Sequence, residues 1–347
     1  MKNLARKSLK RTGSFIPDSL LHRLVGRNKV LGINYHLVSD KKVSYVRHLY
    51  SYKSPGEFEK DIQYLKENFA LLTYDDILNK RHIGASSDRP SAILSFDDGL
   101  SECYSVVRPI LLKYEVPCIF FITTNYIDND SMSFDHIISL CIDRMTALPG
   151  VIQSETLRVI DSIARAPVTD IDGFIKMMMT HRKRDEEIVS EICSLLELKI
   201  HEYLRENKPY LTVSEIQELD KDGFTIGAHS LSHRKLTECS ETEIETEIVE
   251  SCKRIEAITG KKNIPFAFPY NSTGSIDRSF LHELKNKYTI IGLFFHGGGL
   301  IKSRDIMIGR ITADQPYRLI SNRSGLQKLI RRAYRAEYNR LCNDFFH

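Results

Sequence analysis

Two adjacent carboxylates, Asp97 and Asp98, follow the apolar residues 92–94 in the stretch Ser-Phe-Asp-Asp-Gly. The apolar run predicts a buried strand, at whose end two neighbouring carboxylates repel each other and lose hydration. A cation held between them and further ligands would relieve that cost. His229 and His233, in Gly-Ala-His-Ser-Leu-Ser-His, offer two imidazoles. Asp98, His229 and His233 are therefore predicted to bind one metal ion with a position left open for water, which leaves Asp97 to act as a base.

Polar side chains also stand at the ends of other predicted strands: His36, Tyr270 and Arg310. The C-terminal ends of strands in a parallel barrel gather around one site, so this convergence is stronger evidence than any single residue. Each residue also has an ordinary interpretation. A lone His is more often structural, and an Arg at the end of a strand often forms a simple ion pair.

The elements that must position these residues alternate along the chain. Apolar runs predict strands and are separated by segments with helical spacing. The runs are at 30–34, 70–73, 92–94, 117–123, 223–227, 264–268, 288–295 and 306–311. Capping boxes start three of the helices, at Ser54, Thr212 and Ser240. Strands that are hydrophobic on both faces and alternate with helices are typical of a parallel sheet covered by helices, so the fold class is α/β.

The alternation stops between residues 126 and 210, where the pattern is helical and includes one long predicted helix at 186–204. This stretch is interpreted as a helical insertion that forms a lid or substrate platform, or else an interface. The predicted organisation has four parts. A basic N-terminal segment covers residues 1–28, and a barrel covers 29–125 and 211–320. The insertion covers 126–210, and a basic C-terminal helix covers 321–347.

Charge is unevenly distributed along the chain. Residues 1–30 carry eight Lys or Arg against Asp18, and residues 318–347 carry seven against two acidic residues, although the net charge of the whole chain is only +4. Basic ends on an acidic body are compatible with contact to an anionic membrane surface, or simply with solvated termini. No basic-aromatic module indicates nucleic-acid binding. The seven Cys form no CxxC pair, and no apolar run suits a signal peptide or membrane span, so a cytoplasmic protein, with peripheral contact at the inner membrane face, is predicted.

Three motifs together resemble the polysaccharide deacetylases of the NodB-homology type, carbohydrate esterase family 4. They are Ser-Phe-Asp97-Asp98-Gly, His229-Ser-Leu-Ser-His233 and Phe-Ala-Phe-Pro-Tyr270. The resemblance covers residues 30–125 and 211–312. It implies a distorted (β/α)7 barrel and metal-dependent hydrolysis of an acetyl group on an N-acetylated sugar, in surface polysaccharide or glycolipid biosynthesis. The substrate would be a glycan, or a lipid-linked or nucleotide-linked sugar.

The resemblance also implies residue roles. Asp97 would take the proton of a metal-activated water, and the Tyr270 backbone N–H would stabilise the oxyanion. The Tyr-His pair ending at His36 is similar to one branch of the family and favours His36 over His296 as the acid for the leaving amine. Many members place an Arg two residues before the Pro of the third motif to orient the base. Here that position is Ala267, and Arg310 is expected to replace it.

The metal and the reaction each have alternatives. Zinc suits two His and a carboxylate, and nickel, cobalt or iron(II) also fit. The same site would serve a deformylase or an O-deacetylase, and a barrel that binds glycan without turnover is the alternative outside enzymes. The sequence does not indicate the oligomeric state.

Overall fold

The computed structural model describes Pro17 and residues 29–80, 89–164, 167–181, 185–271, 276–298, 300–302, 306–315 and 325–344. The predicted basic segment 1–28 lies outside these residues apart from Pro17, as does the stretch 316–324. Within the described part of the chain, no helix combines the length and apolar character needed to cross a membrane.

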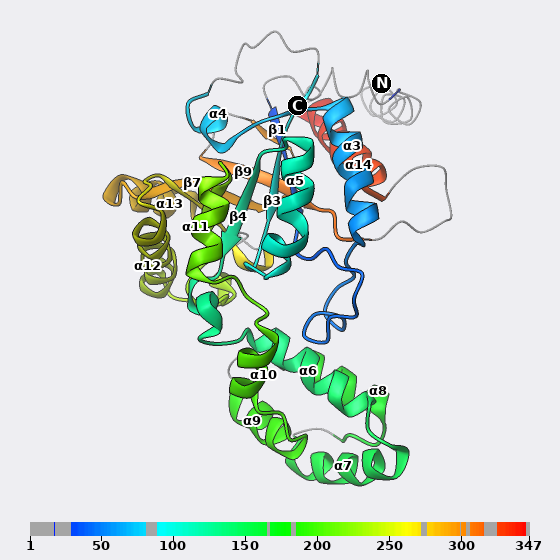
Figure 1. The fold of residues 1–347 in the computed structure, drawn as a ribbon. Coiled ribbons are helices and arrows are strands. Elements are labelled where there is room, and N and C mark those ends of the chain that lie inside the picture. The colour runs from blue at the N-terminus through cyan, green and yellow to red at the C-terminus, as the bar shows by residue number, and fades with distance from the viewer. Residues whose placement is uncertain are drawn as a thin grey trace.

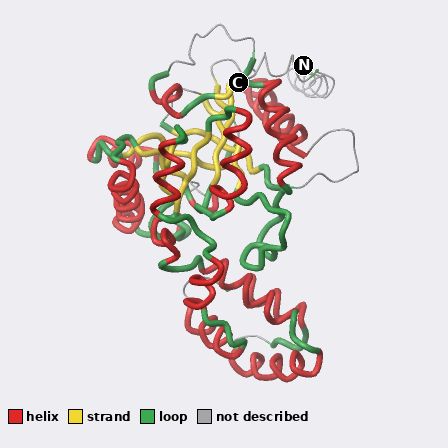
Figure 2. The backbone as a smooth tube through the Cα atoms, viewed as in Figure 1, coloured by secondary structure: helices red, strands yellow, loops and turns green. Residues whose placement is uncertain are grey.

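Among the described residues, seven parallel strands close into a ring, which confirms the predicted distorted (β/α)7 barrel (Figure 2). Strand β1 pairs with β3 on one side and β9 on the other, so the first and last barrel strands are neighbours. Two short strands, β2 and β8, add to β3 and β1 outside the ring. In ring order the barrel strands are β1 (Lys29–Tyr35), β3 (Ser91–Phe96), β4 (Cys118–Ile122), β5 (Thr225–Ala228), β6 (Ile264–Ala267), β7 (Ile291–Gly297) and β9 (Met307–Thr312), with β2 (Ala70–Leu71) and β8 (Ile301–Lys302) outside it.

Helices cover the outside of the barrel (Figure 1). The structure contains the predicted capping boxes at Ser54, Thr212 and Ser240 and a fourth at Thr73, each with a reciprocal acidic residue three positions on. Each box satisfies backbone N–H groups that the first helical turn leaves unpaired. The helices are α3 (Pro55–Asn68), α4 (Tyr74–Leu78), α5 (Arg108–Tyr114), which continues the π-helical turn η1 (Cys103–Val107), α11 (Val213–Lys221), α12 (Glu241–Thr259), α13 (Arg278–Lys287) and α14 (Gly325–Asp344).

Side-chain alternation along the strands decides what points into the barrel. Ile93, Phe121, Phe295 and Ile308 belong to one apolar cluster, and the Phe121 and Phe295 rings, from strands that are not neighbours, lie 5.1 Å apart. The alternate residues of each strand pack outward under the helices. Because side chains alternate with a period of two, polar residues that share the inward positions near the carboxyl ends must face the barrel interior. This brings the predicted site residues together at one end of the barrel.

The segment between β4 and α11 forms a helical arm that extends from the carboxyl end of the barrel (Figure 1). After the turn η2 (Thr124–Asn129), its helices share a core separate from that of the barrel. They are α6 (Phe134–Thr146), α7 (Gly150–Ile163), α8 (Ile171–Thr180), α9 (Glu186–Leu195) and α10 (Ile200–Asn207). The single helix predicted at 186–204 is wrong. Glu197 adopts a left-handed φ of 54°, and the Leu198 N–H bonds back to the Cys193 carbonyl, which ends α9.

Candidate active site

Asp97 is buried at the end of β3 and held on both oxygens. Arg310 from β9 donates to Oδ1 at 2.7 Å and to Oδ2 at 2.8 Å, and the Asn34 side-chain amide from β1 donates to Oδ2 at 2.9 Å. Burial raises the pKa of Asp97, but the charge of Arg310 and the nearby imidazoles outweigh burial, so the pKa is lowered. Asp97 is therefore an ionised carboxylate at neutral pH, fixed in orientation by a bidentate Arg.

Asp98 faces the same site as its neighbour because β3 ends at Phe96 and strand alternation no longer holds at residue 98. Asp98 has a left-handed φ of 72°, a conformation that Asp tolerates better than most residues and that turns its side chain back toward the site. Its Oδ1 lies 3.5 Å from Nε2 of His229 and 3.2 Å from Nε2 of His233. Burial opposes ionisation of Asp98, yet the two imidazoles hold its pKa well below the usual range.

These three residues fit a metal ion. One ligand atom from each of Asp98, His229 and His233 lies within 4.8 Å of the others. The Oδ1 atom of Asp98 is buried and accepts no hydrogen bond from the described residues. The Nδ1–H of His229 donates to the Ala267 carbonyl at 2.9 Å, which leaves the Nε2 lone pair for a metal. Two imidazoles and one carboxylate are a donor set that suits zinc.

His36 lies on the other side of Asp97 and is paired with an aspartate. Asp314, which follows β9, accepts from the His36 backbone N–H at 2.9 Å, and its Oδ2 lies 2.6 Å from the ring Nδ1. The His36 Nε2 then faces the site, 4.0 Å from Asp97 Oδ2. Burial lowers the pKa of His36, but the charge and hydrogen bond of Asp314, together with the charges of Asp98 and Asp97, outweigh burial and raise the pKa to about 10. His36 is therefore placed and charged to donate a proton.

The other predicted acid, His296, lies on β7 directly after the inward-facing Phe295 and pairs in register with Gly309. Strand alternation turns it away from the interior, toward which Phe295 and Arg310 point. Of the two candidates, the structure places His36 within 4.0 Å of the Asp97 carboxylate.

Tyr270 borders the metal-binding residues. Its ring centroid lies 4.9 Å from that of His233, it is 48% exposed, and its backbone has a left-handed φ of 56°. Its hydroxyl donates to Asp135 of α6 at 2.7 Å, so the helical arm reaches the site. Tyr50, from the loop between β1 and α3, packs its ring 5.0 Å from the His36 ring.

Several residues of the site escaped the sequence prediction: Asn34, Tyr50, Asp135 and Asp314. Asn34 had a usable signal, since it is a polar residue two positions before His36 in an otherwise apolar strand and therefore shares its inward face. Asp314 had none, because it lies 278 positions from His36 and the register of two distant strands brings them together.

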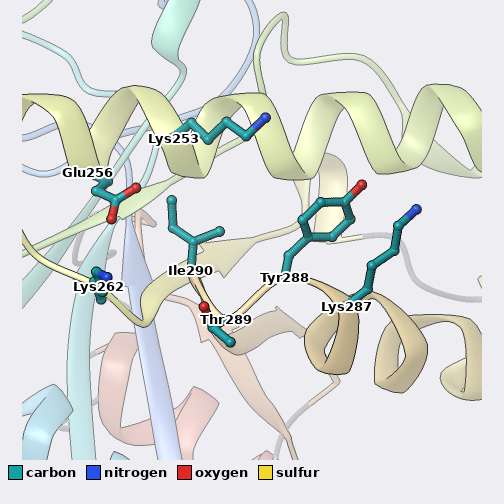
Figure 3. Close-up of a pocket in the computed structure, with 7 residues that line it drawn as sticks. All are labelled: Lys253, Glu256, Lys262, Lys287, Tyr288, Thr289 and Ile290. Carbon is teal, nitrogen blue, oxygen red and sulfur yellow. The ribbon is translucent and has the colours of Figure 1, made fainter.

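A surface pocket lies elsewhere, between α12 and the segment that enters β7 (Figure 3). Residues 288–290 precede β7, so this pocket is at the amino end of the barrel, opposite the site. Lys253 pairs with Glu250 and Lys287 with Glu245, and both are ordinary surface ion pairs. Its lining residues are Lys253, Glu256, Lys262, Lys287, Tyr288, Thr289 and Ile290.

A family model described as polysaccharide deacetylase matches residues 84–172 and 174–289, more than half of the chain. The chain belongs to the polysaccharide deacetylase family. This confirms the resemblance drawn from the three motifs, and the matched residues include Asp97, Asp98, His229, His233 and Tyr270.

Two individual proteins share limited sequence identity with this chain. It is 28% identical over 123 residues to the poly-beta-1,6-N-acetyl-D-glucosamine N-deacetylase of Staphylococcus epidermidis. The match covers 33% of this chain and 42% of the relative, so the chain spans less than half of that protein. The solved structure of the Streptococcus pyogenes deacetylase PplD in complex with acetate is 15% identical and has a TM-score of 0.52 over 87% of this chain and 98% of that one. The latter similarity shows a shared fold.

Proposed function

We propose that this chain is a metal-dependent N-deacetylase that hydrolyses the acetamide of an N-acetylated sugar. The observation that carries the proposal is a deprotonated carboxylate close to a protonated imidazole, both beside Asp98, His229 and His233. Asp97 is held ionised and His36 is held protonated, and their side chains approach to 4.0 Å. Amide hydrolysis needs a base for the attacking water and an acid for the departing amine.

Asp97 acts as the base in this proposal. Its Oδ2 is the oxygen nearer to both imidazoles, 3.9 Å from His229 Nε2 and 4.0 Å from His36 Nε2. Arg310 and Asn34 fix the carboxylate so that this oxygen stays aimed at the site. Arg310 thereby takes the place that Ala267 leaves empty relative to many members of the family.

His36 delivers a proton to the leaving nitrogen. Asp314 occupies Nδ1 and orients the ring, so the proton on Nε2 is the one available to the substrate. Tyr270 contributes its backbone N–H, which we assign to the developing oxyanion, and its half-exposed ring packs beside His233.

Asp98, His229 and His233 would hold the metal ion. When bound, a divalent cation supplies Lewis acidity for the carbonyl and lowers the pKa of water toward ~7. The donor set favours Zn²⁺, with Ni²⁺, Co²⁺ and Fe²⁺ as the metals to compare.

The proposed substrate class is supported by the family and by the relative whose name specifies poly-beta-1,6-N-acetyl-D-glucosamine. We propose an N-acetylhexosamine glycan or its lipid-linked or nucleotide-linked precursor. Contact of the basic ends with an anionic membrane surface belongs to the precursor version of this proposal.

The test measures metal content and acetate release on a panel of β-1,6-linked N-acetylglucosamine oligomers, chitin oligomers and lipid-linked or nucleotide-linked N-acetylglucosamine. We expect one equivalent of metal and activity that D97N lowers by about 10²–10⁴-fold, because Asn cannot accept the proton. The control is D75N, at the exposed first turn of α4, which should keep full activity. A chain without stoichiometric metal, or an active D97N, would contradict the proposal. Cleavage of chitin oligomers alone would contradict the proposal of a lipid-linked or nucleotide-linked precursor as substrate.

A further inference from the structure

We propose that Glu247 of α12 is a positioning residue that shapes the loop carrying His229 and His233 and so presets the metal site. The inference rests on the proposed function only in taking these two histidines as metal ligands. Glu247 lies 14 residues after His233 and is 6% exposed. Nothing in the motif that contains the histidines points to it.

Glu247 binds the middle of the loop with both carboxylate oxygens. Its Oε2 accepts from the backbone N–H of Leu231 at 2.9 Å and of Ser232 at 3.0 Å. Its Oε1 accepts from the Ser232 hydroxyl at 2.5 Å. Two successive backbone N–H groups that converge on one anion form a nest, a concavity with a strong preference for a carboxylate.

The loop needs such a restraint because its backbone is strained. Ser230 and His233 both adopt left-handed conformations, with φ of 67° and 56°, although neither is a glycine. Conformations of this kind persist only where surrounding contacts hold them. The shape they impose is what lets two histidines four positions apart, outside any helix, present their Nε2 atoms to the same Asp98 oxygen.

The opposite side of the loop is held by the barrel. Thr124 and Asn125, just after β4, donate their backbone N–H groups to the carbonyls of Ser230 and Leu231 at 3.1 and 2.9 Å. Glu247 completes this clamp from α12. That helix is a firm support, since its capping box fixes its first turn and Ile244 and Ile248 are buried in the main core.

The decisive experiment compares E247Q with E250Q. Gln preserves the size of the side chain but removes the negative charge that the two backbone N–H groups of Leu231 and Ser232 converge on. Glu250 lies on the same helix, is exposed and pairs only with Lys253 among the described contacts, so E250Q is a matched control. Zn²⁺ affinity is measured by competition with a chromogenic chelator, Co²⁺ geometry by visible absorption, and stability of the metal-free protein by urea unfolding.

We expect E247Q to bind Zn²⁺ about 10–100-fold more weakly than the wild type, with an altered Co²⁺ spectrum, while E250Q matches the wild type. S232A removes only the hydroxyl contact and should weaken Zn²⁺ binding less than E247Q does. A purely structural role would lower the urea midpoint and leave the affinity and the spectrum of the folded protein unchanged.

A folded E247Q with wild-type Zn²⁺ affinity and Co²⁺ spectrum would overturn the assignment. If E247Q fails to fold, E247D decides the matter, because it keeps the charge but shortens the side chain by one methylene group and so withdraws the carboxylate from Leu231 and Ser232: weaker Zn²⁺ binding supports the clamp, and unchanged binding refutes it. A wild-type chain that binds no Zn²⁺ or Co²⁺ would instead overturn the proposed metal site itself, so the two failures are distinguishable.

Discussion

Asp97 and Asp98 are neighbours in the chain and share one site, yet their surroundings prepare them for different tasks. Asp97 faces a guanidinium that fixes both of its oxygens, which suits a base that must stay aimed. Asp98 faces two imidazole nitrogens, and its buried Oδ1 accepts no hydrogen bond from the part of the chain that the structure describes, which suits a ligand. The two proposed roles therefore follow from the surroundings of the two aspartates and not from their residue type.

The pairing of His36 with Asp314 predicts how activity depends on pH. Because Asp314 raises the pKa of His36, the imidazolium that we propose as the acid persists to higher pH, and the alkaline limb of kcat/KM should follow its titration. A bound divalent cation would act in the opposite direction on this pKa. In D314N the charge that raises the pKa is lost, so the alkaline limb should move to lower pH by about 1–3 units.

The matched control for D314N is D277N. Asp277 caps the first turn of α13 at the surface, where Asn caps equally well, so its pH profile should equal that of the wild type. An alkaline limb that stays in place in D314N would show that the His36 proton does not govern it.

Among single residues, the sequence predicted those that stand in a recognisable local motif. Asp98, His229 and His233 stand in short motifs at strand ends, and the structure brings them together. The sequence alone could not predict that His36 pairs with Asp314 or that Asn34 donates to Asp97. Those contacts depend on the register between strands made from distant parts of the chain, which no local pattern encodes.

Strand packing explains how Arg310 reaches the base. Gly32 of β1 lies beside it in register, and a Cβ at Gly32 would come within 2.5 Å of Arg310 Cγ and 2.7 Å of the Gly309 carbonyl. The absence of a side chain at Gly32 thus provides the path along which the Arg310 side chain crosses the barrel interior to Asp97. Gly32 belongs to the same strand as Asn34, and His36 follows directly after that strand.

We therefore expect G32A to destabilise the fold and to impair the base at the same time. Contacts this close require backbone or side-chain shifts that cost about 1–3 kcal/mol of unfolding free energy, and a displaced Arg310 lowers kcat. Urea unfolding and steady-state kinetics measure the two effects. In G56A, at the start of α3, the new Cβ meets nothing within 4 Å, so stability should be unchanged or slightly raised. A G32A protein as stable and active as the wild type would refute this account of Gly32.

Most of the elements themselves follow from local patterns. The barrel strands are continuous apolar runs, and capping boxes mark the starts of helices, so both could be predicted in place. The break between α9 and α10 could not be predicted from the sequence. Position 197 is a Glu and not a Gly or Pro, and the apolar spacing continues on both sides of it. The two-residue strand β8 is too short to leave any pattern.

Over the whole molecule, the helical arm and the barrel meet at the site through Asp135 and Tyr270. The contact joins the first turn of α6 to the loop that follows β6, beside His233. If the arm helps to set the position of Tyr270, D135A and Y270F should each lower kcat/KM, and their effects should be non-additive by about 0.5–3 kcal/mol.

Kinetics of the wild type, both single variants and the double variant measure this coupling. The control pair is D135A with Y288F, whose hydroxyl contacts Glu245 at the amino end of the barrel, and its effects should simply add. Additive effects for D135A and Y270F would mean that the arm and the loop act separately.

The position of β1 between β3 and β9 has a consequence for the order of synthesis. All three proposed metal ligands have left the ribosome once residue 233 emerges, whereas Arg310 and Asp314 arrive with the last strand of the ring. A nascent or truncated chain that ends before β9 would carry the ion-binding residues with neither an oriented base nor a charged acid. The hydrolytic activity proposed for this chain thus requires that β9 has already paired with β1.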